Sequence, residues 1–353
     1  MPPDTKTLVI LTPGFPANEA DTACLPWVQN LVRELKQNFP GVHFVVVAFH
    51  YPFKKEDYKW NGVQVTSFNG GNKGGLRRLL LWYAVWRRLS ALNKKYHIIG
   101  LFSLWIGECA LIGKYFGKRH DILHRTWVVG QDAKKDNRWV KRINLRANEM
   151  AALSDFIARE LQHNYGVRPQ FTIPGGVDPN EYAQPPAARD IDVMGAGSLI
   201  PLKQFNVFIE VIAEVRKRHP NIQSLIVGKG PEQQSLQSQI RSLDLQANLE
   251  LIGEVSYQEV LRRMQRTKIF VHTSSYEGLG MVCTEALYAG AHVISFVKPF
   301  EKDIPHWHIV RNKEEMLEKL LELLHDPMLD HSPVMHFAAK DTATAVMNLY
   351  NTQ

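Results

Sequence analysis

The chain has 353 residues, enough for two domains of ordinary size, and its 45% hydrophobic and 22% charged residues are close to the average for globular proteins. This composition excludes a disordered, collagen-like or coiled-coil chain, and three widely spaced cysteines (Cys24, Cys109 and Cys283) exclude a disulfide framework or a zinc finger. The net charge of +7 is uneven, because residues 1–183 hold 25 Lys and Arg against 15 Asp and Glu, whereas residues 184–353 hold 17 against 20. Such a basic excess is typical either of a solvated surface or of attraction to a membrane, a phosphorylated substrate or nucleic acid.

The beginning of the chain has an apolar run that is too short for the core of a signal peptide. No uncharged apolar stretch approaches the roughly 20 residues that a membrane span needs. We therefore expect a soluble protein of a reducing compartment, in the cytoplasm.

The first half of the chain alternates short apolar runs with longer helical patterns. Buried strands are expected over 8–11, 44–49 and 97–103, and helices over 25–39, 76–92, 107–116 and 139–164, followed by a turn-rich segment over 173–182. After a Pro-rich linker at 182–190, a second series of alternating strands and helices begins. Strands are expected over 191–197, 224–230, 249–255, 268–274 and 292–296, and helices over 204–218, 231–243, 258–265 and 281–288. Repeated strand–helix units predict two doubly wound α/β domains with parallel sheets.

Four of the expected strand-to-helix turns carry glycine: Gly14, Gly197, Gly228 and Gly280. Glycine allows a ligand to approach the backbone closely, and the free N–H groups of a helix start favour phosphate. The chain has neither a full GxGxxG pattern nor a GxxxxGK[ST] loop, which disfavours a nicotinamide dehydrogenase and a P-loop enzyme. Together the turns predict a nucleotide or phosphate cleft at the carboxyl ends of the strands.

An acidic pair lies in the segment 274–290. Glu277 follows a strand in the segment EGLG, and Glu285 comes eight residues later within a helix. Eight helical residues rise about 12 Å, comparable to the length of a nucleoside diphosphate group. One carboxylate can therefore meet each end of a nucleotide-linked ligand, with the helix-opening amides between them.

The segment 277–285, EGLGMVCTE, resembles the E-x7-E signature of the family 4 retaining glycosyltransferases. Further segments that resemble the family are LTPGFP, IPGGVD, GAGSLIPLK, LIVGKGPE and LELIGEV. The resemblance implies the GT-B fold, in which two Rossmann-like doubly wound domains face each other across a cleft. It also implies an acceptor-side domain at 1–183, a nucleotide-sugar donor domain at 190–335 and a C-terminal helix within 336–353 that packs back on the first domain.

Carried over by position, the resemblance implies catalytic roles for Glu277, beside the donor sugar, and for Lys203, which would neutralise the diphosphate leaving group. Glu285 would bind the ribose hydroxyls. The other donor-binding residues that it implies are Gly14, Gly197, Ser198, Gly228, Gly253, Glu254, Val255, Leu279, Gly280 and Met281.

The chain departs from the family pattern at two places. The family pairs its lysine with an arginine five residues earlier, where this chain has Ser198, so one partner for the diphosphate charge is missing. Many relatives have a histidine where Val129 stands, for which His124 is a poorly aligned substitute. Gln131 and Asp132 remain candidates for contacts with donor or acceptor.

The implied function is retaining transfer of a sugar from a nucleotide-diphosphate sugar to a carbohydrate or lipid-linked hydroxyl acceptor, in envelope polysaccharide or glycolipid assembly. Because a lysine and helix amides can stabilise the leaving diphosphate, we expect neither a cofactor nor a catalytic metal. Two alternatives stay open: a nucleotide-sugar epimerase of the same fold, and a non-catalytic nucleotide-sugar-binding or membrane-associated protein.

The helix expected from Leu76 to Leu92 has Arg pairs on both sides of an apolar segment that contains two Trp residues. This pattern fits either a helix lying on an anionic membrane or a core helix whose charged ends reach solvent. On the membrane interpretation the protein is peripheral on the inner face of the membrane. No nucleic-acid-binding motif is present, and we expect no nucleic-acid partner.

Overall fold

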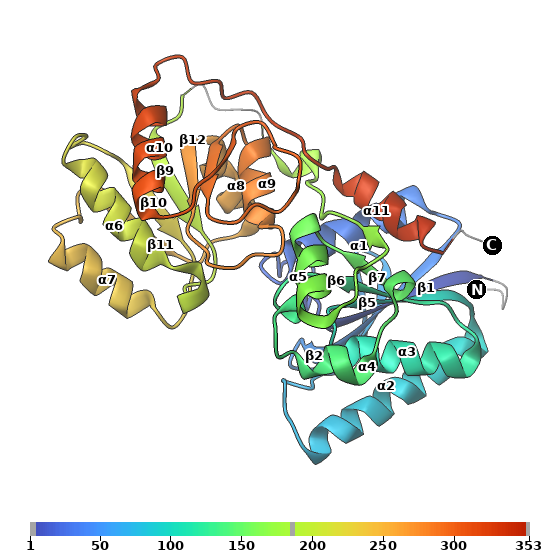
Figure 1. Cartoon of the computed structure of the whole chain (residues 1–353). Coiled ribbons are helices and arrows are strands. Elements are labelled where there is room, and N and C mark those ends of the chain that lie inside the picture. The colour runs from blue at the N-terminus through green and yellow to red at the C-terminus, as the bar shows by residue number, and fades with distance from the viewer. Residues whose placement is uncertain (1–4, 184–187, 351–353) are drawn as a thin grey trace. The chain divides into compact units, whose positions relative to one another are not determined.

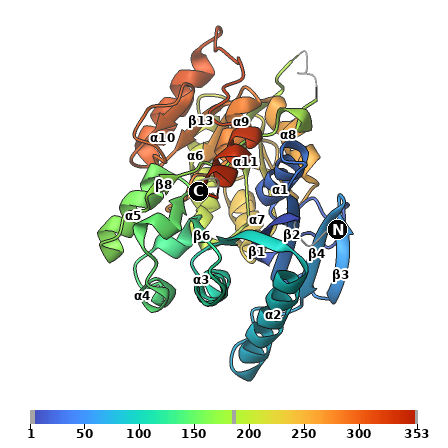
Figure 2. The same cartoon turned by 90° about the vertical axis from the view of Figure 1, so that its right-hand side faces the viewer.

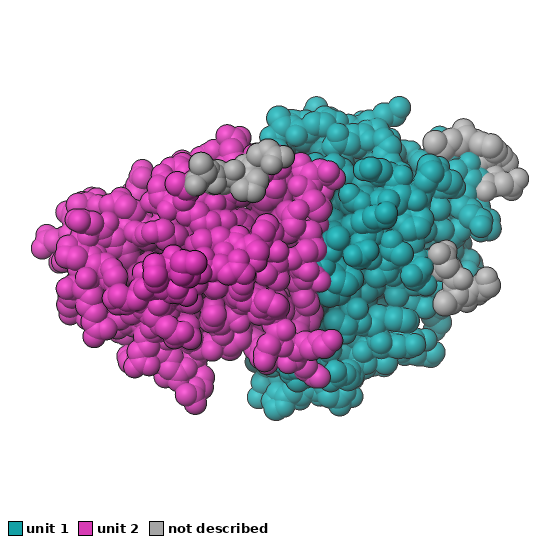
Figure 3. Space-filling view, turned by 90° about the horizontal axis from the view of Figure 1, so that it is seen from above, with its two compact units in different colours: residues 1–176, 337–353 teal, residues 177–336 magenta. Residues whose placement is uncertain are grey.

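The computed structural model describes residues 5–183 and 188–350 (Figure 1). The chain forms two compact units, coloured separately in Figure 3: unit 1 contains residues 1–176 and 337–353, and unit 2 contains residues 177–336. The centre of the expected Pro-rich linker, 184–187, lies outside the described residues.

Unit 1 is built on an eight-stranded sheet with the order β3-β4-β2-β1-β5-β6-β7-β8. Its strands are β1 (Lys6–Gly14), β2 (His43–Tyr51), β3 (Lys55–Trp60), β4 (Val63–Phe68), β5 (His97–Leu104), β6 (His124–Val128), β7 (Met150–Ala152) and β8 (Phe171–Thr172). All neighbours pair in parallel except β3 and β4, which form an antiparallel hairpin at one edge.

Helices cover both faces of this sheet. They are α1 (Pro26–Asn38), α2 (Leu76–Lys95), α3 (Glu108–His120), α4 (Arg138–Ile143), α5 (Asp155–Tyr165) and α11 (Ala339–Asn348). Figures 1 and 2 show α2 and α3 on the face of the sheet opposite to α1. Because side chains alternate along a strand, Val9 and Leu11 of β1 pack in one core cluster with Leu81 and Val85 of α2.

The C-terminal helix α11 belongs to unit 1, where it packs against α1. The Thr342 hydroxyl donates to the Pro174 carbonyl at 2.9 Å, and the Tyr350 hydroxyl donates to the Leu101 carbonyl at 2.9 Å. Gly176 meets the start of this helix so closely that a Cβ atom there would lie 2.3 Å from the Ala338 carbonyl oxygen. Hydrogen bonds between residues far apart in sequence thus hold α11 and Tyr350 in unit 1.

The single helix expected over 139–164 is wrong. Asn144, in the left-handed region at φ 51°, ends α4, and the buried segment Met150–Ala152 pairs with β6 as strand β7. Ser154 then caps α5, where its hydroxyl accepts from the Ile157 N–H at 3.3 Å. A three-residue apolar strand between two helices has too few residues to show a period of two.

The β3–β4 hairpin was not expected either. Its turn is Asn61-Gly62, with φ of 45° and 72°, as two-residue hairpin turns require. The two strands do not form apolar runs, and β3 alternates between exposed and less exposed residues. The Asn-Gly pair between them is the sequence signal that predicts this hairpin.

Unit 2 is built on a six-stranded, all-parallel sheet with the order β11-β10-β9-β12-β13-β14. Its strands are β9 (Ile191–Ala196), β10 (Ser224–Val227), β11 (Leu249–Gly253), β12 (Thr267–His272), β13 (His292–Ser295) and β14 (Trp307–Ile309). Its helices are α6 (Phe205–Arg216), α7 (Gln233–Ser242), α8 (Tyr257–Gln265), α9 (Met281–Tyr288) and α10 (Lys313–His325). The expected strands and helices of this half are confirmed, and β14 and α10 are additions to them.

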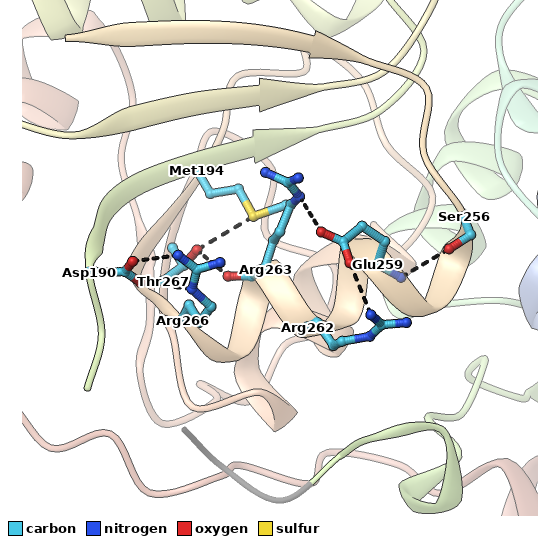
Figure 4. Close-up of polar contacts among 8 residues, drawn as sticks. All are labelled: Asp190, Met194, Ser256, Glu259, Arg262, Arg263, Arg266 and Thr267. Carbon is cyan, nitrogen blue, oxygen red and sulfur yellow. Dashed lines mark hydrogen bonds and ion pairs between the residues drawn. The ribbon is translucent and has the colours of Figure 1, made fainter. Parts of the chain in front are cut away.

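Figure 1 shows α6, α7 and α10 on one side of the second sheet and α8 and α9 on the other. Figure 4 shows how α8 is anchored. The Ser256 hydroxyl caps its first turn by accepting from the Glu259 N–H at 3.3 Å. At its end, the Arg266 guanidinium forms a two-pronged ion pair with Asp190, just before β9. The Thr267 hydroxyl donates to the Arg263 carbonyl at 2.7 Å.

These contacts hold α8 against the amino end of β9. The two sheets together confirm the expected pair of doubly wound α/β domains. Among the described residues, no helix has the length and apolar character needed to cross a membrane.

Candidate active site

Four loops of unit 2 lie side by side at one edge of its sheet. Since β11, β10, β9 and β12 are adjacent and parallel, the residues that follow them meet at the same edge. These are Gly253 at the end of β11, Gly228 after β10, Gly197 after β9 and Glu277 after β12. We call this group of loops the strand-end cluster, and it brings together most of the donor-binding residues expected from the sequence.

Glycine is required at the centre of this cluster. Gly197 and Gly228 have φ of 153° and 151°, where other residues are strained. A Cβ atom on Gly228 would lie 1.8 Å from the Gly197 carbonyl oxygen. The Gly197 N–H donates to the Val227 carbonyl and the Gly228 N–H to the Gly253 carbonyl, at 2.9 and 2.8 Å. The turns at Gly197 and Gly228 are therefore packed directly against each other, and the glycines present backbone atoms and no side chain there.

Lys203 and Glu277 form an ion pair in this cluster, between Lys203 Nζ and Glu277 Oε2. Lys203 ends the short 3₁₀ helix η4 (Pro201–Lys203). This turn is tied to the loop after β12, because the Thr273 hydroxyl donates to the Lys203 carbonyl at 2.7 Å and the Ser275 N–H donates to the Leu202 carbonyl at 3.1 Å. Both charged side chains remain partly exposed, at 18% and 24%, so a ligand can reach them.

His272, the last residue of β12, stands behind this pair and was not predicted as a site residue. Its Nε2 lies 3.6 Å from Glu277 Oε2 and 3.3 Å from the Ser274 hydroxyl oxygen. Burial lowers the pKa of His272 to about 4, with a further lowering from Lys203 and an opposing effect of Glu277. The imidazole is thus neutral at pH 7 and lies beside Glu277 without adding charge.

Helix α9 opens directly beside Glu277. Its N-cap is Gly280, with φ of 72°, and no side chain caps its first turn. A Cβ atom on Gly280 would lie 3.3 Å from the Glu277 Cγ atom, so the glutamate side chain passes over the helix start. The first N–H groups of a helix lack partners within the helix and attract anions. Leu279 is buried and Met281 is half-buried at this turn.

Glu285 lies in α9 and is almost entirely buried. Its Oε1 accepts a hydrogen bond from the Tyr257 hydroxyl at 2.9 Å. Burial raises the pKa of Glu285 to about 7, against a lowering by Tyr257. Burial, followed by the charge of Glu285, raises the pKa of the Tyr257 phenol well above its ordinary value, so the phenol remains a donor. Glu285 is therefore held in one orientation and divided between its two protonation states at neutral pH.

The remaining expected donor residues of unit 2 differ in exposure. Ser198 and Glu254 are exposed and Val255 is half-buried. Lys229 follows Gly228 directly and has an exposed side chain, for which the described part of the chain provides no ion pair. The strand-end cluster thus offers a second cation, Lys229, in the turn after β10. This turn lies next to the turn after β9, which contains Ser198.

In unit 1, Gly14 lies at the end of β1, where a Cβ atom would be 3.5 Å from Tyr51 Cβ, an ordinary contact. Gln131 is exposed and begins the 3₁₀ helix η1 (Gln131–Ala133) beyond the carboxyl end of β6. Asp132 is buried, and its two carboxylate oxygens accept from the Gly130 N–H at 2.7 Å and the Ile106 N–H at 2.9 Å. Asp132 therefore joins the loops after β5 and β6.

His124 is not brought together with Gln131 and Asp132. It is the first residue of the five-residue strand β6, so it lies at the amino end of that strand, whereas the other two follow the carboxyl end. About 16 Å of extended chain separates the two ends. The number of residues between His124 and Gln131 did not reveal this difference, because sequence separation does not show at which end of a strand a residue lies.

A second polar group at the carboxyl edge of the first sheet was also missed. Glu108, at the start of α3, accepts from the Trp82 indole N–H at 2.6 Å and pairs with Arg78 Nε at 3.0 Å. His50, near the end of β2, has its Nε2 4.0 Å from Glu108 Oε1. No run of residues signals this group, since it assembles from β2, α2 and α3. Across residues 5–183 and 188–350, no group of three or more His, Cys, Asp or Glu is arranged to hold a metal ion.

Two family models match the chain and together extend over residues 27–336. The model described as Glycosyltransferase Family 4 matches residues 27–181, and the model described as Glycosyl transferases group 1 matches residues 161–336. The chain belongs to the family 4 glycosyltransferases. The group 1 model covers all of the strand-end cluster, with Lys203 and Glu277, and also Glu285 in α9.

Relatives of this family 4 chain include two proteins named for transfer to phosphatidylinositol compounds. It is 29% identical over 133 residues to the phosphatidylinositol N-acetylglucosaminyltransferase gpi3 subunit of Schizosaccharomyces pombe, a match that covers 36% of this chain and 29% of that protein. It is 25% identical over 216 residues to a GDP-mannose-dependent monoacylated alpha-(1-6)-phosphatidylinositol monomannoside mannosyltransferase of Corynebacterium glutamicum, covering 54% of this chain and 56% of that protein. The chain thus spans well under two thirds of the length of either relative.

Among solved structures, Anabaena Alr3699/HepE in complex with UDP and glucose matches 98% of this chain and 95% of its own chain, with a TM-score of 0.67 and 16% identity. Identity this low shows the fold alone. The fold is GT-B, as expected from the sequence.

Proposed function

We propose that this protein is a retaining glycosyltransferase that moves a sugar from a nucleotide-diphosphate sugar to a hydroxyl acceptor. The bond between the sugar's anomeric carbon and the diphosphate oxygen breaks, and a bond from that carbon to the acceptor oxygen forms on the same face. The acceptor proton passes to the departing diphosphate. The reaction consumes one donor and releases one nucleoside diphosphate.

The observation that carries this proposal is the Lys203–Glu277 pair beside the uncapped start of α9. Breaking the sugar–diphosphate bond builds negative charge on the leaving phosphate. An ammonium group and oriented N–H groups stabilise that charge in place and require no metal. Glu277 stands between them, where it can accept hydrogen bonds from sugar hydroxyls.

The other donor contacts follow from the same cluster. Glu285 is proposed to accept hydrogen bonds from the ribose hydroxyls, because its orientation is fixed by Tyr257. The backbone at Gly197 and Gly228 allows the diphosphate to approach closely. Lys229 is proposed as the second cation on the diphosphate, in place of the arginine that Ser198 replaces. Unit 1 is proposed to bind the acceptor, with Gln131 as an exposed contact.

The acceptor is proposed to be a carbohydrate or a lipid-linked sugar. Both relatives described above are named for acceptors that contain phosphatidylinositol, which is a membrane lipid. A protein that glycosylates such an acceptor benefits from staying at the membrane surface. This supports a peripheral position on the cytoplasmic face of a membrane.

Helix α2 supplies a surface suited to that position. Four of its apolar side chains are more than half exposed: Leu76, Leu79, Leu80 and Tyr83. They recur at helical spacing along one side, while Leu81, Val85, Leu89 and Leu92 pack into the core. Exposed Arg77 and Arg87 flank the apolar side. Apolar side chains bordered by arginine are typical of helices that lie on anionic membranes.

The proposal is tested first by nucleotide-sugar binding. Thermal unfolding is measured with UDP-, GDP-, ADP- and dTDP-linked sugars, since a ligand at 100 times its Kd adds about 2.7 kcal/mol of stability. At least one of these is expected to raise Tm, and no shift with any would contradict the proposal. Release of nucleoside diphosphate that depends on an acceptor identifies the transferase. Release or isomerisation without acceptor indicates an epimerase, and binding with neither indicates a non-catalytic protein.

A further inference from the structure

A large cavity lies in unit 1, away from the loops that follow the carboxyl ends of its strands. Its volume is about 1160 Å³. It is lined where α3 ends, where β6 begins at His124 and Arg125, and where α4 runs into the following loop. None of its lining residues belongs to the strand-end cluster. It is therefore a separate surface, at the amino-terminal edge of the first sheet.

The lining of this cavity is strongly basic. Five lining residues carry positive charge and two carry negative charge: Lys114, Lys118, Arg125, Lys141 and Arg146 against Asp121 and Glu149. Lys114 is already engaged, since its Nζ lies 3.1 Å from Glu149 Oε2 and donates to the Asn144 carbonyl at 2.7 Å. In the part of the chain that the structure describes, no carboxylate forms an ion pair with Lys118, Arg125 or Lys141. Unpaired cations around a concavity attract an anion.

Two residues that line the cavity, His124 and Arg125, carry buried polar atoms without partners among the described residues. His124 is 6% exposed, and within the described residues its Nδ1 has no hydrogen-bond partner. The same holds for Arg125 Nε. Leaving a buried donor or acceptor unsatisfied costs about 1–3 kcal/mol, so such atoms call for an explanation.

The hydrogen bonds around His124 indicate which proton it carries. The Ser103 hydroxyl donates to the Cys109 carbonyl at 3.0 Å, and its oxygen lies 2.9 Å from His124 Nε2. The Thr126 hydroxyl oxygen is farther from Nε2, at 3.5 Å. Since the Ser103 hydroxyl proton is used, we assign the tautomer in which Nε2–H donates to Ser103 and Nδ1 is an acceptor. Burial, followed by Lys114 and Arg125, lowers the pKa of His124 to about 3, so the ring is neutral.

Helix α3 has glycines where it crosses this histidine. A Cβ atom on Gly113 would lie 2.6 Å from His124 Nε2, and one on Gly117 would lie 3.3 Å from His124 Cβ. The glycines therefore make room for an imidazole in the wall of a basic cavity. An acceptor nitrogen among cations matches a ligand that carries both a hydroxyl group and an anionic group.

We propose that this cavity binds a phosphorylated sugar or polyol, whose phosphate contacts Lys118, Arg125 and Lys141 and whose hydroxyl donates to His124. The proposal is independent of the function proposed for the strand-end cluster, because the two surfaces share no residue. The cavity belongs to unit 1, and the Lys203–Glu277 pair belongs to unit 2.

The test is isothermal titration of the full chain at 150 mM salt with glucose 6-phosphate, inorganic phosphate and glucose as separate probes. Glucose 6-phosphate is expected to bind at least tenfold more tightly than either of the others. Excess UDP is expected to leave its affinity unchanged, because the cavity shares no residue with the strand-end cluster. Loss of binding in UDP, or equal affinity for glucose 6-phosphate and inorganic phosphate, would overturn the proposal.

Variants locate the binding. Lys118→Glu with Lys141→Glu is expected to weaken glucose 6-phosphate binding at least tenfold, and both side chains are exposed, so folding is retained. The control is Lys94→Glu with Lys302→Glu, which makes the same charge change at exposed residues elsewhere and is expected to bind as wild type. His124→Phe is expected to remove the preference over inorganic phosphate. Equal losses in the two charge variants would mean diffuse electrostatic attraction only and would refute the site.

Discussion

Glu277 Oε2 contacts two side chains that differ in charge. It forms an ion pair with Lys203, and it lies 3.6 Å from the neutral, buried imidazole of His272. The carboxylate thus faces a cation on one side and a buried ring on the other. It also lies over Gly280 at the start of α9. Under the proposed function, this carboxylate accepts hydrogen bonds from the sugar of the donor.

The two lysines of the strand-end cluster should differ in their effect on turnover. Lys203→Met removes a partly enclosed cation from the leaving diphosphate, for which a loss of about 10²–10³ in kcat is expected. Lys229→Met, at an exposed position, should lower kcat about tenfold. Lys340→Met, an exposed lysine of α11, is the control and should leave kcat unchanged. Steady-state rates of nucleotide release measure all three, and an inactive Lys340→Met or a fully active Lys203→Met would contradict the assignment.

Glu285 should make stability depend on pH. Its pKa is raised from 4.5 to about 7 in the folded chain, so the folded state resists ionisation that the unfolded state accepts. Stability is therefore lost as pH rises from about 4.5 to 7 and is constant above that. The shift corresponds to about 3 kcal/mol. Urea unfolding measures the free energy of unfolding of wild type and Glu285→Gln. The difference between the two proteins should change by this amount across that pH range, and a difference independent of pH would refute the prediction.

Gly228 should tolerate no side chain. Gly228→Ala places Cβ on the Gly197 carbonyl and is expected to destabilise unit 2 by more than about 3 kcal/mol. Gly253→Ala is the matched control: its φ is 80°, but a Cβ atom there meets nothing within 4 Å. Only the backbone strain of about 1–2 kcal/mol applies to it. Similar losses in the two variants, measured by denaturant unfolding, would show that contact with Gly197 is not decisive.

Helix α2 should govern membrane attachment. Leu79→Glu with Tyr83→Glu places charge on its exposed apolar side and is expected to reduce co-sedimentation with anionic vesicles at least fivefold. Met328→Glu with Met335→Glu changes two exposed apolar residues of unit 2 equally and should have no effect. Neutral vesicles should bind the wild type weakly. Equal sedimentation of all proteins would contradict a role for this helix.

Much of the fold was predictable because buried parallel strands contain continuous apolar runs, as at 8–11 and 225–227, each followed by a turn and a helix. Short strands escaped for the opposite reason. β7 has only three residues, and β3 is an edge strand with alternating exposure, so neither forms an apolar run. The GT-B fold itself was inferred from the resemblance carried by the segment EGLGMVCTE.

The site was predictable only where residues lie near each other in sequence. Glu277 and the start of α9 belong to one loop, and the glycine turns mark their own strand ends. His272 was missed because a single histidine at the end of an apolar strand gives no pattern. His124 was predicted as a substitute for the family histidine at the position of Val129, although it lies at the amino end of β6 and Gln131 follows the carboxyl end. Contacts made across elements, such as Glu108 with Arg78, leave no trace in the sequence.

The central claim is that Glu277 acts in sugar transfer at the strand-end cluster. The most direct measurement is acceptor-dependent release of nucleoside diphosphate by wild type and Glu277→Ala, with the anomeric configuration of the product determined by NMR. Wild type is expected to release nucleoside diphosphate and form a retained linkage, and the variant is expected to have at least a 10²-fold lower rate at an unchanged Tm. Wild-type turnover in Glu277→Ala, or an inverted linkage, would contradict it.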